Sequence, residues 1–162
     1  MSGISARPDR APKILVVDDD EAVRDSIGMV LRAAGYAVQT ATDGEQALVR
    51  FQEGRVDLLL LDLGLPVKTG WEVFERISTD YPAVPIIIMT GLSNQQFSAL
   101  AAGASVLMEK PLDVVSLLRC IKELLAEPVE KRTNRLRGHG RDFRRVPPAS
   151  WFSTNDSSSV PA

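Results

Sequence analysis

The chain has 162 residues, of which 44% are hydrophobic and 25% charged, and its formal net charge is −2 at pH 7. This length suits one domain with a substantial core, and the composition is that of an ordinary globular chain. The single cysteine excludes an internal disulfide, and no apolar run approaches the roughly 20 residues that a membrane span needs.

The first part of the chain alternates short apolar runs with helical patterns. Strands are predicted at residues 13–17 and 36–41, and the helical pattern between them is ended by Gly35. A capping-type turn at residues 42–45 predicts the start of a second helix, which Gly54 ends. The pattern up to this point is therefore strand, helix, strand, helix.

The same alternation continues in the second part of the chain. The expected elements are a strand at 56–62, a helix containing 73–77, a strand at 86–89 that ends in Thr90, a helix at 92–102 ended by Gly103, a strand from 106 to Lys110, and a helix at 113–126. The strands are runs of Val, Ile and Leu without polar alternation, which is typical of strands buried on both faces. The sequence therefore predicts an α/β fold with a parallel sheet and helices on both sides.

Four of the predicted strands end in residues that carry chemistry. One ends in Asp18-Asp19-Asp20 and another in Asp62, while Thr90 and Lys110 end the last two. In an open α/β sheet the binding site lies beyond the carboxyl ends of the strands. Neighbouring carboxylates there repel each other unless a cation lies between them, so the pattern predicts a divalent metal ion and a phosphoryl-binding site.

These residues stand in motifs that resemble the receiver domain of two-component response regulators. The resemblance rests on Leu15-Val16-Val17-Asp18-Asp19-Asp20, Asp62-Leu63-Gly64-Leu65-Pro66 with Gly70, Met89-Thr90-Gly91 and Lys110-Pro111, and it covers about residues 12–127. It implies a flavodoxin-like, doubly wound (βα)5 fold whose five parallel strands have the order 2-1-3-4-5.

The resemblance also implies a role for each residue of the site. Asp62 would accept a phosphoryl group, Asp18, Asp19, Asp62 and the backbone carbonyl of Gly64 would bind Mg²⁺, and Thr90 and Lys110 would contact the phosphoryl oxygens. A small hard cation with oxygen ligands fits such a set. The protein would modify itself at Asp62 and would not otherwise be an enzyme.

The triple acid leaves a question of register, because either its first or its last two residues could bind the metal. Counting from the end of the apolar strand favours Asp18 and Asp19, which leaves Asp20 as a helix N-cap. Taken singly, each motif also has a purely structural interpretation. The acids could begin a helix, Asp62 could form a turn, and Lys110 could be an exposed loop residue.

Two positions depart from the receiver pattern or modify it. Leu107 stands where receivers commonly carry Tyr or Phe, so we expect phosphorylation to be reported by residues 91–96 and the following helix instead. Gly91 follows Thr90 and leaves the phosphoryl site open to water, which predicts a short-lived aspartyl phosphate.

Charge divides the chain into a folded body and a tail. Residues 12–127 carry 10 Lys or Arg and 17 Asp or Glu, whereas residues 128–162 carry 7 and 3. We expect a flexible leader at 1–11, a receiver domain at 12–127 and a disordered basic tail at 128–162. The tail could bind nucleic acid with Trp151-Phe152 as an anchor, but nucleic acid is not the expected partner.

The expected partners are a sensor histidine kinase or a histidine phosphotransfer protein, and an unknown output protein. The helix after Asp20 would face the phosphodonor, and a homodimer through the fourth and fifth helices is a further expectation. Without an apolar signal-peptide core at its start, the chain is expected to be cytoplasmic and not to bind a membrane. The leading expectation is a single-domain receiver that acts through phosphorylation-dependent contacts with other proteins. The alternatives are a degenerate receiver that serves as a scaffold without phosphorylation and a Mg²⁺-dependent phosphohydrolase, although the latter would need an acid where Gly64 stands.

Overall fold

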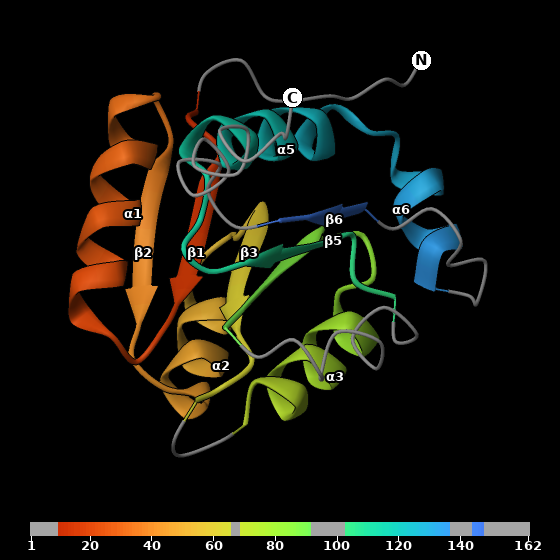
Figure 1. Ribbon diagram of the computed structural model, residues 1–162. Coiled ribbons are helices and arrows are strands. Elements are labelled where there is room, and N and C mark those ends of the chain that lie inside the picture. Colours follow the sequence, from red (N-terminus) through yellow and green to blue (C-terminus); the bar gives the residue numbers. More distant parts are fainter. Residues whose placement is uncertain (1–9, 66–68, 92–102, 137–143, 148–162) are drawn as a thin grey trace, which may run out of the picture.

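A computed structural model describes residues 10–65, 69–91, 103–136 and 144–147, which form a parallel sheet covered by helices on both faces (Figure 1). The strands are β1 (Lys13–Val17), β2 (Ala37–Ala41), β3 (Leu58–Asp62), β4 (Ile86–Thr90), β5 (Val106–Glu109) and β6 (Arg144–Val146). The helices are α1 (Glu21–Ala33), α2 (Gly44–Glu53), α3 (Gly70–Asp80), α5 (Val114–Ala126) and α6 (Val129–Leu136). None of the helices described here has the length and apolar character that a membrane span requires.

The strand order is β2-β1-β3-β4-β5-β6, and every neighbouring pair is parallel. The predicted order of the first five strands, 2-1-3-4-5, is therefore confirmed. Because all the strands run the same way, their carboxyl ends meet at one edge of the sheet, and the chain reverses its winding direction between β1 and β3. The residues that the sequence analysis singled out, Asp18, Asp62, Thr90 and Lys110, stand at this carboxyl edge.

Alternate residues of the central strands supply two separate cores. In β3, Leu59 and Leu61 pack with α2 and α3, whereas Leu58 and Leu60 pack with α1 and α5. All four leucines are fully buried. Burial on both faces explains why the strand sequence shows no polar alternation, as expected for a central parallel strand.

Short polar side chains begin the helices that follow the strands. Asp20 caps α1, Asp43 caps α2, Thr69 caps α3 and Asp113 caps α5, each accepting hydrogen bonds from backbone N–H groups of the first turn. The expected N-cap role of Asp20 is confirmed. Gly35, between α1 and β2, has a φ of 97°, a backbone conformation that favours glycine.

The expectation of a disordered tail does not hold for the part of it that is described. Residues 129–136 form α6, and Arg132 ties this helix to the body by donating hydrogen bonds to the carbonyls of Ala83, Leu124 and Leu125 at 3.0–3.2 Å. Val146 of β6 is buried in the core beneath α5. A three-residue strand is too short for a periodicity argument to detect.

Some sequence expectations fall outside the described residues. These are the helix at 92–102, the middle of the loop after Asp62 at 66–68, the leader at 1–9 and the tail segments at 137–143 and 148–162.

Replacement of Gly70 by alanine tests how tightly the β3–α3 connection is packed. An added Cβ would lie 2.5 Å from the backbone oxygen of Asp62 and would also overlap the Cα of Leu63. Backbone cannot move aside as a flexible side chain can, so we expect Gly70→Ala to lower the free energy of unfolding by about 1–3 kcal/mol. Urea denaturation measures this loss.

The matched control is Gly91→Ala, at the end of the next strand. A Cβ on Gly91 meets no atom within 4 Å, so the change should leave stability within about 0.5–1 kcal/mol of the parent. Equal stabilities for the two variants would contradict the packing argument.

Candidate functional site

Three acidic residues meet where β1 and β3 end. The register pairs Val17 with Leu61, so Asp18 and Asp62 leave adjacent strands at the same level. Both are buried, whereas Asp19 is exposed. One carboxylate oxygen from each of Asp18, Asp19 and Asp62 lies within 4.8 Å of the others. The carboxyl edge therefore holds a tight group of three acids.

The turn after β1 fixes which of the three consecutive acids belong to this group. Oδ1 of Asp18 accepts a hydrogen bond from the backbone N–H of Asp20 at 2.9 Å. Oδ1 of Asp20 accepts from the N–H groups of Ala22 and Val23, which holds this side chain on the first turn of α1. Asp18 and Asp19 are thereby left beside Asp62, in agreement with the register favoured by the sequence.

Lys110 connects the buried acids from the end of β5. Its Nζ lies 2.7 Å from Oδ2 of Asp18 and 3.3 Å from Oδ2 of Asp62. Burial by itself lowers the pKa of Lys110, but the hydrogen bond to Asp18 and the charge of Asp62 outweigh it, so the pKa lies above its ordinary value. Lys110 therefore stays charged and offsets part of the carboxylate repulsion.

Asp62 remains electrostatically unsatisfied despite this lysine. Burial raises the pKa of its carboxyl above the ordinary value and the Asp18 carboxylate raises it further, while the Gly64 N–H and Lys110 act in the opposite direction. The Gly64 N–H donates to Oδ1 of Asp62 at 3.0 Å. An additional positive charge in this site would favour the ionised form of Asp62.

The acid group has the composition that a small divalent cation requires. Mg²⁺ binds oxygen ligands at about 2.0–2.1 Å, so two ligands on opposite sides of the ion are about 4.0–4.2 Å apart. At least two of the three oxygen pairs would be neighbouring ligands, which are about 2.9 Å apart around an octahedral Mg²⁺. The oxygens, now within 4.8 Å of one another, would therefore move closer together when the ion binds. The residues thus fit Mg²⁺. The predicted part of the Gly64 carbonyl as a ligand stays a prediction.

Thr90 and Leu107 belong to the neighbouring strands β4 and β5. Thr90 ends β4 one residue beyond Met89, the register partner of Asp62, and is buried at the same edge. The Lys110 N–H donates to the Thr90 carbonyl at 2.9 Å, which links the two strand ends. Leu107 is fully buried in the core on the α2 and α3 face, so this position carries a packed aliphatic side chain.

Arg24 is a neighbour of the site that the sequence interpretation missed. Its Nη1 donates to the backbone carbonyl of Asp18 at 2.6 Å, which ties the acidic turn to α1. The signal was present, because Arg24 stands four residues after the N-cap Asp20 and a helical side chain leans back toward the preceding turn. A charged residue in that position reaches the strand end from which the helix departs.

The sequence and the fold both match known proteins. The family model for the response regulator receiver domain matches residues 14–122. The chain is 34% identical over 129 residues to the DNA-binding dual master transcriptional regulator RpaA of Synechocystis, covering 77% of this chain and 52% of RpaA. It is 36% identical over 115 residues to the response regulator MprA of Mycobacterium leprae, covering 70% and 50%. The chain thus spans about half the length of the curated relatives it matches.

Solved receiver structures match over nearly their whole length. A CheY-like receiver domain protein from Methanospirillum hungatei is 35% identical with a TM-score of 0.70, covering 75% of this chain and 98% of the other. TrrA from Thermotoga maritima, solved in complex with Mg²⁺-BeF, is 32% identical with a TM-score of 0.66, covering 70% and 98%.

Removal of the Lys110 charge tests whether this lysine offsets the repulsion between the buried carboxylates of Asp18 and Asp62. Lys110→Met leaves the fully buried Asp18 beside Asp62 without this cation, and we expect the free energy of unfolding in EDTA to fall by about 3 kcal/mol. Urea denaturation without metal measures the loss. The matched control Lys122→Met, at an exposed position of α5, should change stability by less than about 0.5 kcal/mol. Equal effects of the two substitutions on stability would show that the ion pairs of Lys110 do not offset the repulsion between the carboxylates of Asp18 and Asp62.

Proposed function

The chain belongs to the response regulator receiver domain family, and on this premise we propose that it accepts a phosphoryl group at Asp62 in a two-component system. One observation carries the proposal. The buried Asp62 shares a lysine with a second buried carboxylate, at 3.3 Å and 2.7 Å, at the open edge of the sheet. Such an arrangement concentrates charge at the place where an incoming phosphoryl group would have to be neutralised.

In the proposed reaction an Asp62 oxygen attacks phosphorus, and the bond from phosphorus to the donor nitrogen breaks. The electron pair of that bond stays with the donor imidazole. The Gly64 N–H holds Oδ1 of Asp62 and thereby orients the carboxylate. Lys110 lies closer to Asp18 than to Asp62, so it can turn toward a phosphoryl oxygen while it keeps its buried partner.

Asp18, Asp19 and Asp62, with the Gly64 carbonyl, are the residues we propose for Mg²⁺. When bound, Mg²⁺ would offset the carboxylate repulsion and the charge on the transferred phosphoryl group. The Mg²⁺-BeF complex of TrrA, a relative of similar fold, supports this assignment. Thr90 would donate a hydrogen bond to a phosphoryl oxygen from the end of β4.

The conformational response should differ from a receiver that reports through an aromatic ring. Leu107 is fully buried in the core on the α2 and α3 face and has no polar group to reorient. We therefore place the response in the segment from Gly91 to residue 96 and in the helix expected after it. Residues 92–96 lie outside the part of the chain that the structure describes.

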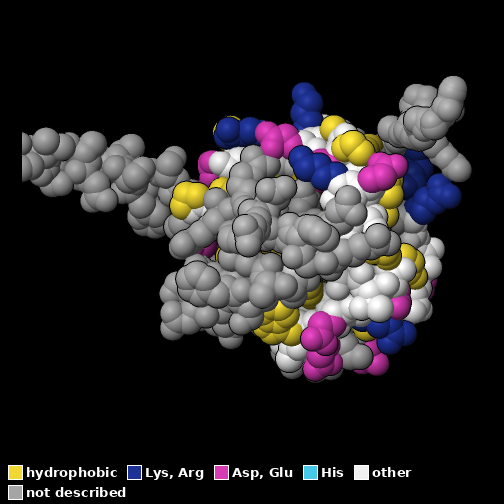
Figure 2. All heavy atoms as spheres, turned by 90° about the vertical axis from the view of Figure 1, so that its right-hand side faces the viewer, with side chains coloured by type: hydrophobic (Ala, Val, Ile, Leu, Met, Phe, Trp, Pro, Cys, Tyr) yellow, Lys and Arg dark blue, Asp and Glu magenta, His cyan; other side chains and the backbone are white. Residues whose placement is uncertain are grey.

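The proposed phosphodonor is a sensor histidine kinase or a histidine phosphotransfer protein that approaches α1. Output would follow through contacts with another protein or a second copy, the latter through α5 and the helix expected at 92–102. The DNA-binding named for RpaA belongs to a protein whose matched part is 52% of its length. On the described part of the face carrying α6, basic and acidic side chains are interspersed (Figure 2), which does not favour a continuous nucleic-acid surface.

Asp62→Asn is the direct test of the phosphoacceptor. Incubation of the parent chain with acetyl phosphate and Mg²⁺ should add one phosphoryl group to the intact mass, and EDTA or Asp62→Asn should abolish the adduct. Asp57→Asn is the matched control, because Asp57 precedes the amino end of the same strand and pairs with Arg10. It should retain the adduct.

The outcome also separates the alternatives. An adduct that survives in Asp62→Asn would place phosphorylation elsewhere. A parent chain without adduct, but with Mg²⁺ binding by titration calorimetry and no transfer from a cognate kinase, would instead favour the scaffold. Continuous turnover of phosphate esters would favour a phosphohydrolase, for which Gly64 provides no acid.

Substitution at Gly91 tests the control of dephosphorylation. A Cβ there meets no atom within 4 Å, so Val or Leu can be introduced beside Thr90. We expect severalfold slower loss of the phosphoryl adduct, because the added side chain limits the access of water to Asp62. The decay of the adduct followed by mass spectrometry measures the rate. An unchanged decay rate with normal stability would rule out steric access as the control.

A further inference from the structure

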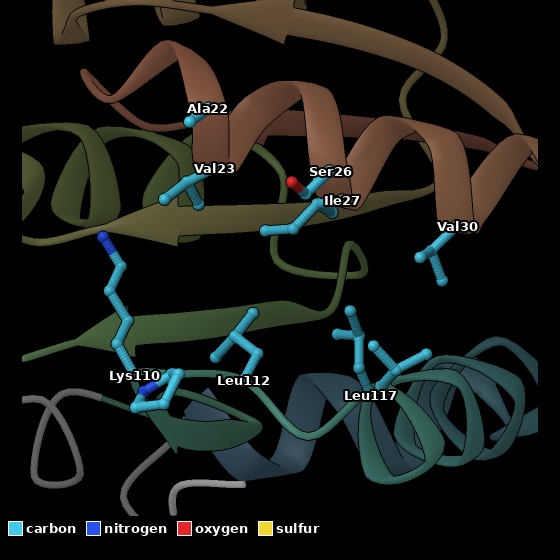
Figure 3. A pocket seen from close by; sticks show the side chains of 10 residues that line it. Ala22, Val23, Ser26, Ile27, Val30, Lys110, Leu112 and Leu117 are labelled. Atoms are coloured by element: carbon cyan, nitrogen blue, oxygen red, sulfur yellow. The ribbon is translucent and has the colours of Figure 1, made fainter.

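An apolar groove separates α1 from α5 on the same face of the sheet. Its volume is about 480 Å³, which is within the range of about 300–1,000 Å³ that is typical of ligand pockets. The side chains from the two helices point toward one another across it, and Lys110 marks one end (Figure 3). The lining residues come from α1, from the segment 110–112 and from the first turns of α5. Apart from Ser26 and Lys110 all are apolar, so the groove suits an apolar side chain.

Strand β6 fixes the point at which the following residues leave the sheet. It pairs in parallel with β5 and sets Val146 opposite Met108. Both side chains are buried in the core on the α1 and α5 face. Because the strands are parallel, the chain leaves Val146 at the carboxyl edge, close to the level at which β5 gives way to Lys110.

The residues that follow β6 are long enough, when extended, to cross from β6 toward the groove. Trp151 stands five residues after Val146, and five extended residues span about 16–18 Å. Neighbouring strands are about 4.8 Å apart, so this length crosses about three strands. Pro147-Pro148 favours the extended backbone that such a crossing needs.

The composition of this segment matches the groove. Trp151 and Phe152 are the only aromatic residues between Pro147 and Ala162, and they stand among Ser, Thr, Asn and Asp. Each aromatic side chain can bury about 150–250 Å² of surface. We propose that Trp151-Phe152 docks in the groove between α1 and α5 of its own chain and covers the part of α1 next to Lys110.

The tether favours the chain's own groove over that of a second copy. A short connection gives the aromatic pair an effective concentration in the millimolar range, far above the concentration of a second copy in a dilute solution. The anchor of the connection is already in place, since Val146 is buried and α6 is held by Arg132. The groove therefore has an occupant that needs no partner protein.

Tryptophan fluorescence of the full chain tests the proposal. The chain has two tryptophans, and Trp71→Phe leaves Trp151 as the only reporter. We expect blue-shifted emission and severalfold weaker quenching by acrylamide than in a free peptide of residues 147–162. Emission and quenching equal to those of the peptide would overturn the proposal.

A pair of substitutions on the first turn of α5 shows where Trp151 binds. Val114 lines the groove and Val115, at 67% exposure, does not. Glutamate is compatible with a helix amino end at either position. Val114→Glu should raise the quenching of Trp151 to that of the peptide, and Val115→Glu should leave it unchanged. The same response from both variants would exclude the groove as the site.

Two further measurements complete the test. Protection of Trp151 should persist on hundredfold dilution, whereas its loss on dilution would show that a second copy supplies the tail and would overturn the intramolecular form. In the unsubstituted chain, nuclear Overhauser contacts should join the Trp151 ring to methyl groups of Val23 or Leu117. Their absence, in a chain whose folded spectrum is otherwise intact, would overturn the proposal without any dependence on the Trp71 variant.

Discussion

The contact of Lys110 with Asp18 and Asp62 is the interaction on which the rest of the carboxyl edge depends. Two buried carboxylates on neighbouring strands repel each other, and the shared lysine at 2.7 Å and 3.3 Å keeps that repulsion from becoming prohibitive. The pKa of Asp62 nevertheless lies above its ordinary value, chiefly because of burial. An added positive charge next to Asp62 would therefore be favourable, and this part of the carboxyl edge suits a metal ion and a phosphoryl group.

Parallel pairing brings four separate strand ends together at one site. The registers of β1 with β3, β3 with β4 and β4 with β5 bring Asp18, Asp62, Thr90 and Lys110 to a common edge from positions up to 92 residues apart. Two hydrogen bonds to backbone carbonyls hold the edge together. Arg24 ties the acidic turn to α1, and the Lys110 N–H joins the end of β4. Rigid strands thus position the site, and the helices cover the two hydrophobic cores that keep the strands in register.

The sixth strand extends the sheet beyond β5. β6 covers the edge of β5, and its buried Val146 continues the core beneath α5. The segment that follows starts at the same edge as the acid group, so the site and the apolar groove beside it share Lys110 as a boundary. A tail that leaves the sheet at this point can influence access to α1, whereas one that ended at the opposite edge could not.

The sequence by itself determined the alternating elements, the parallel sheet and the candidate residues, because apolar runs without polar alternation end in Asp, Asp, Thr and Lys and the spacing admits few topologies. It also predicted Asp20 as the cap of α1, since that role depends only on the following turn. Only the tertiary structure decided that Lys110 lies closer to Asp18 than to Asp62. It also decided that Arg24 contacts the Asp18 carbonyl and that residues 144–146 join the sheet. Each of these depends on contacts between distant segments, which local patterns do not encode. A three-residue strand has too few residues to show a period, and it exists because the free edge of β5 offers it hydrogen bonds and a place for Val146.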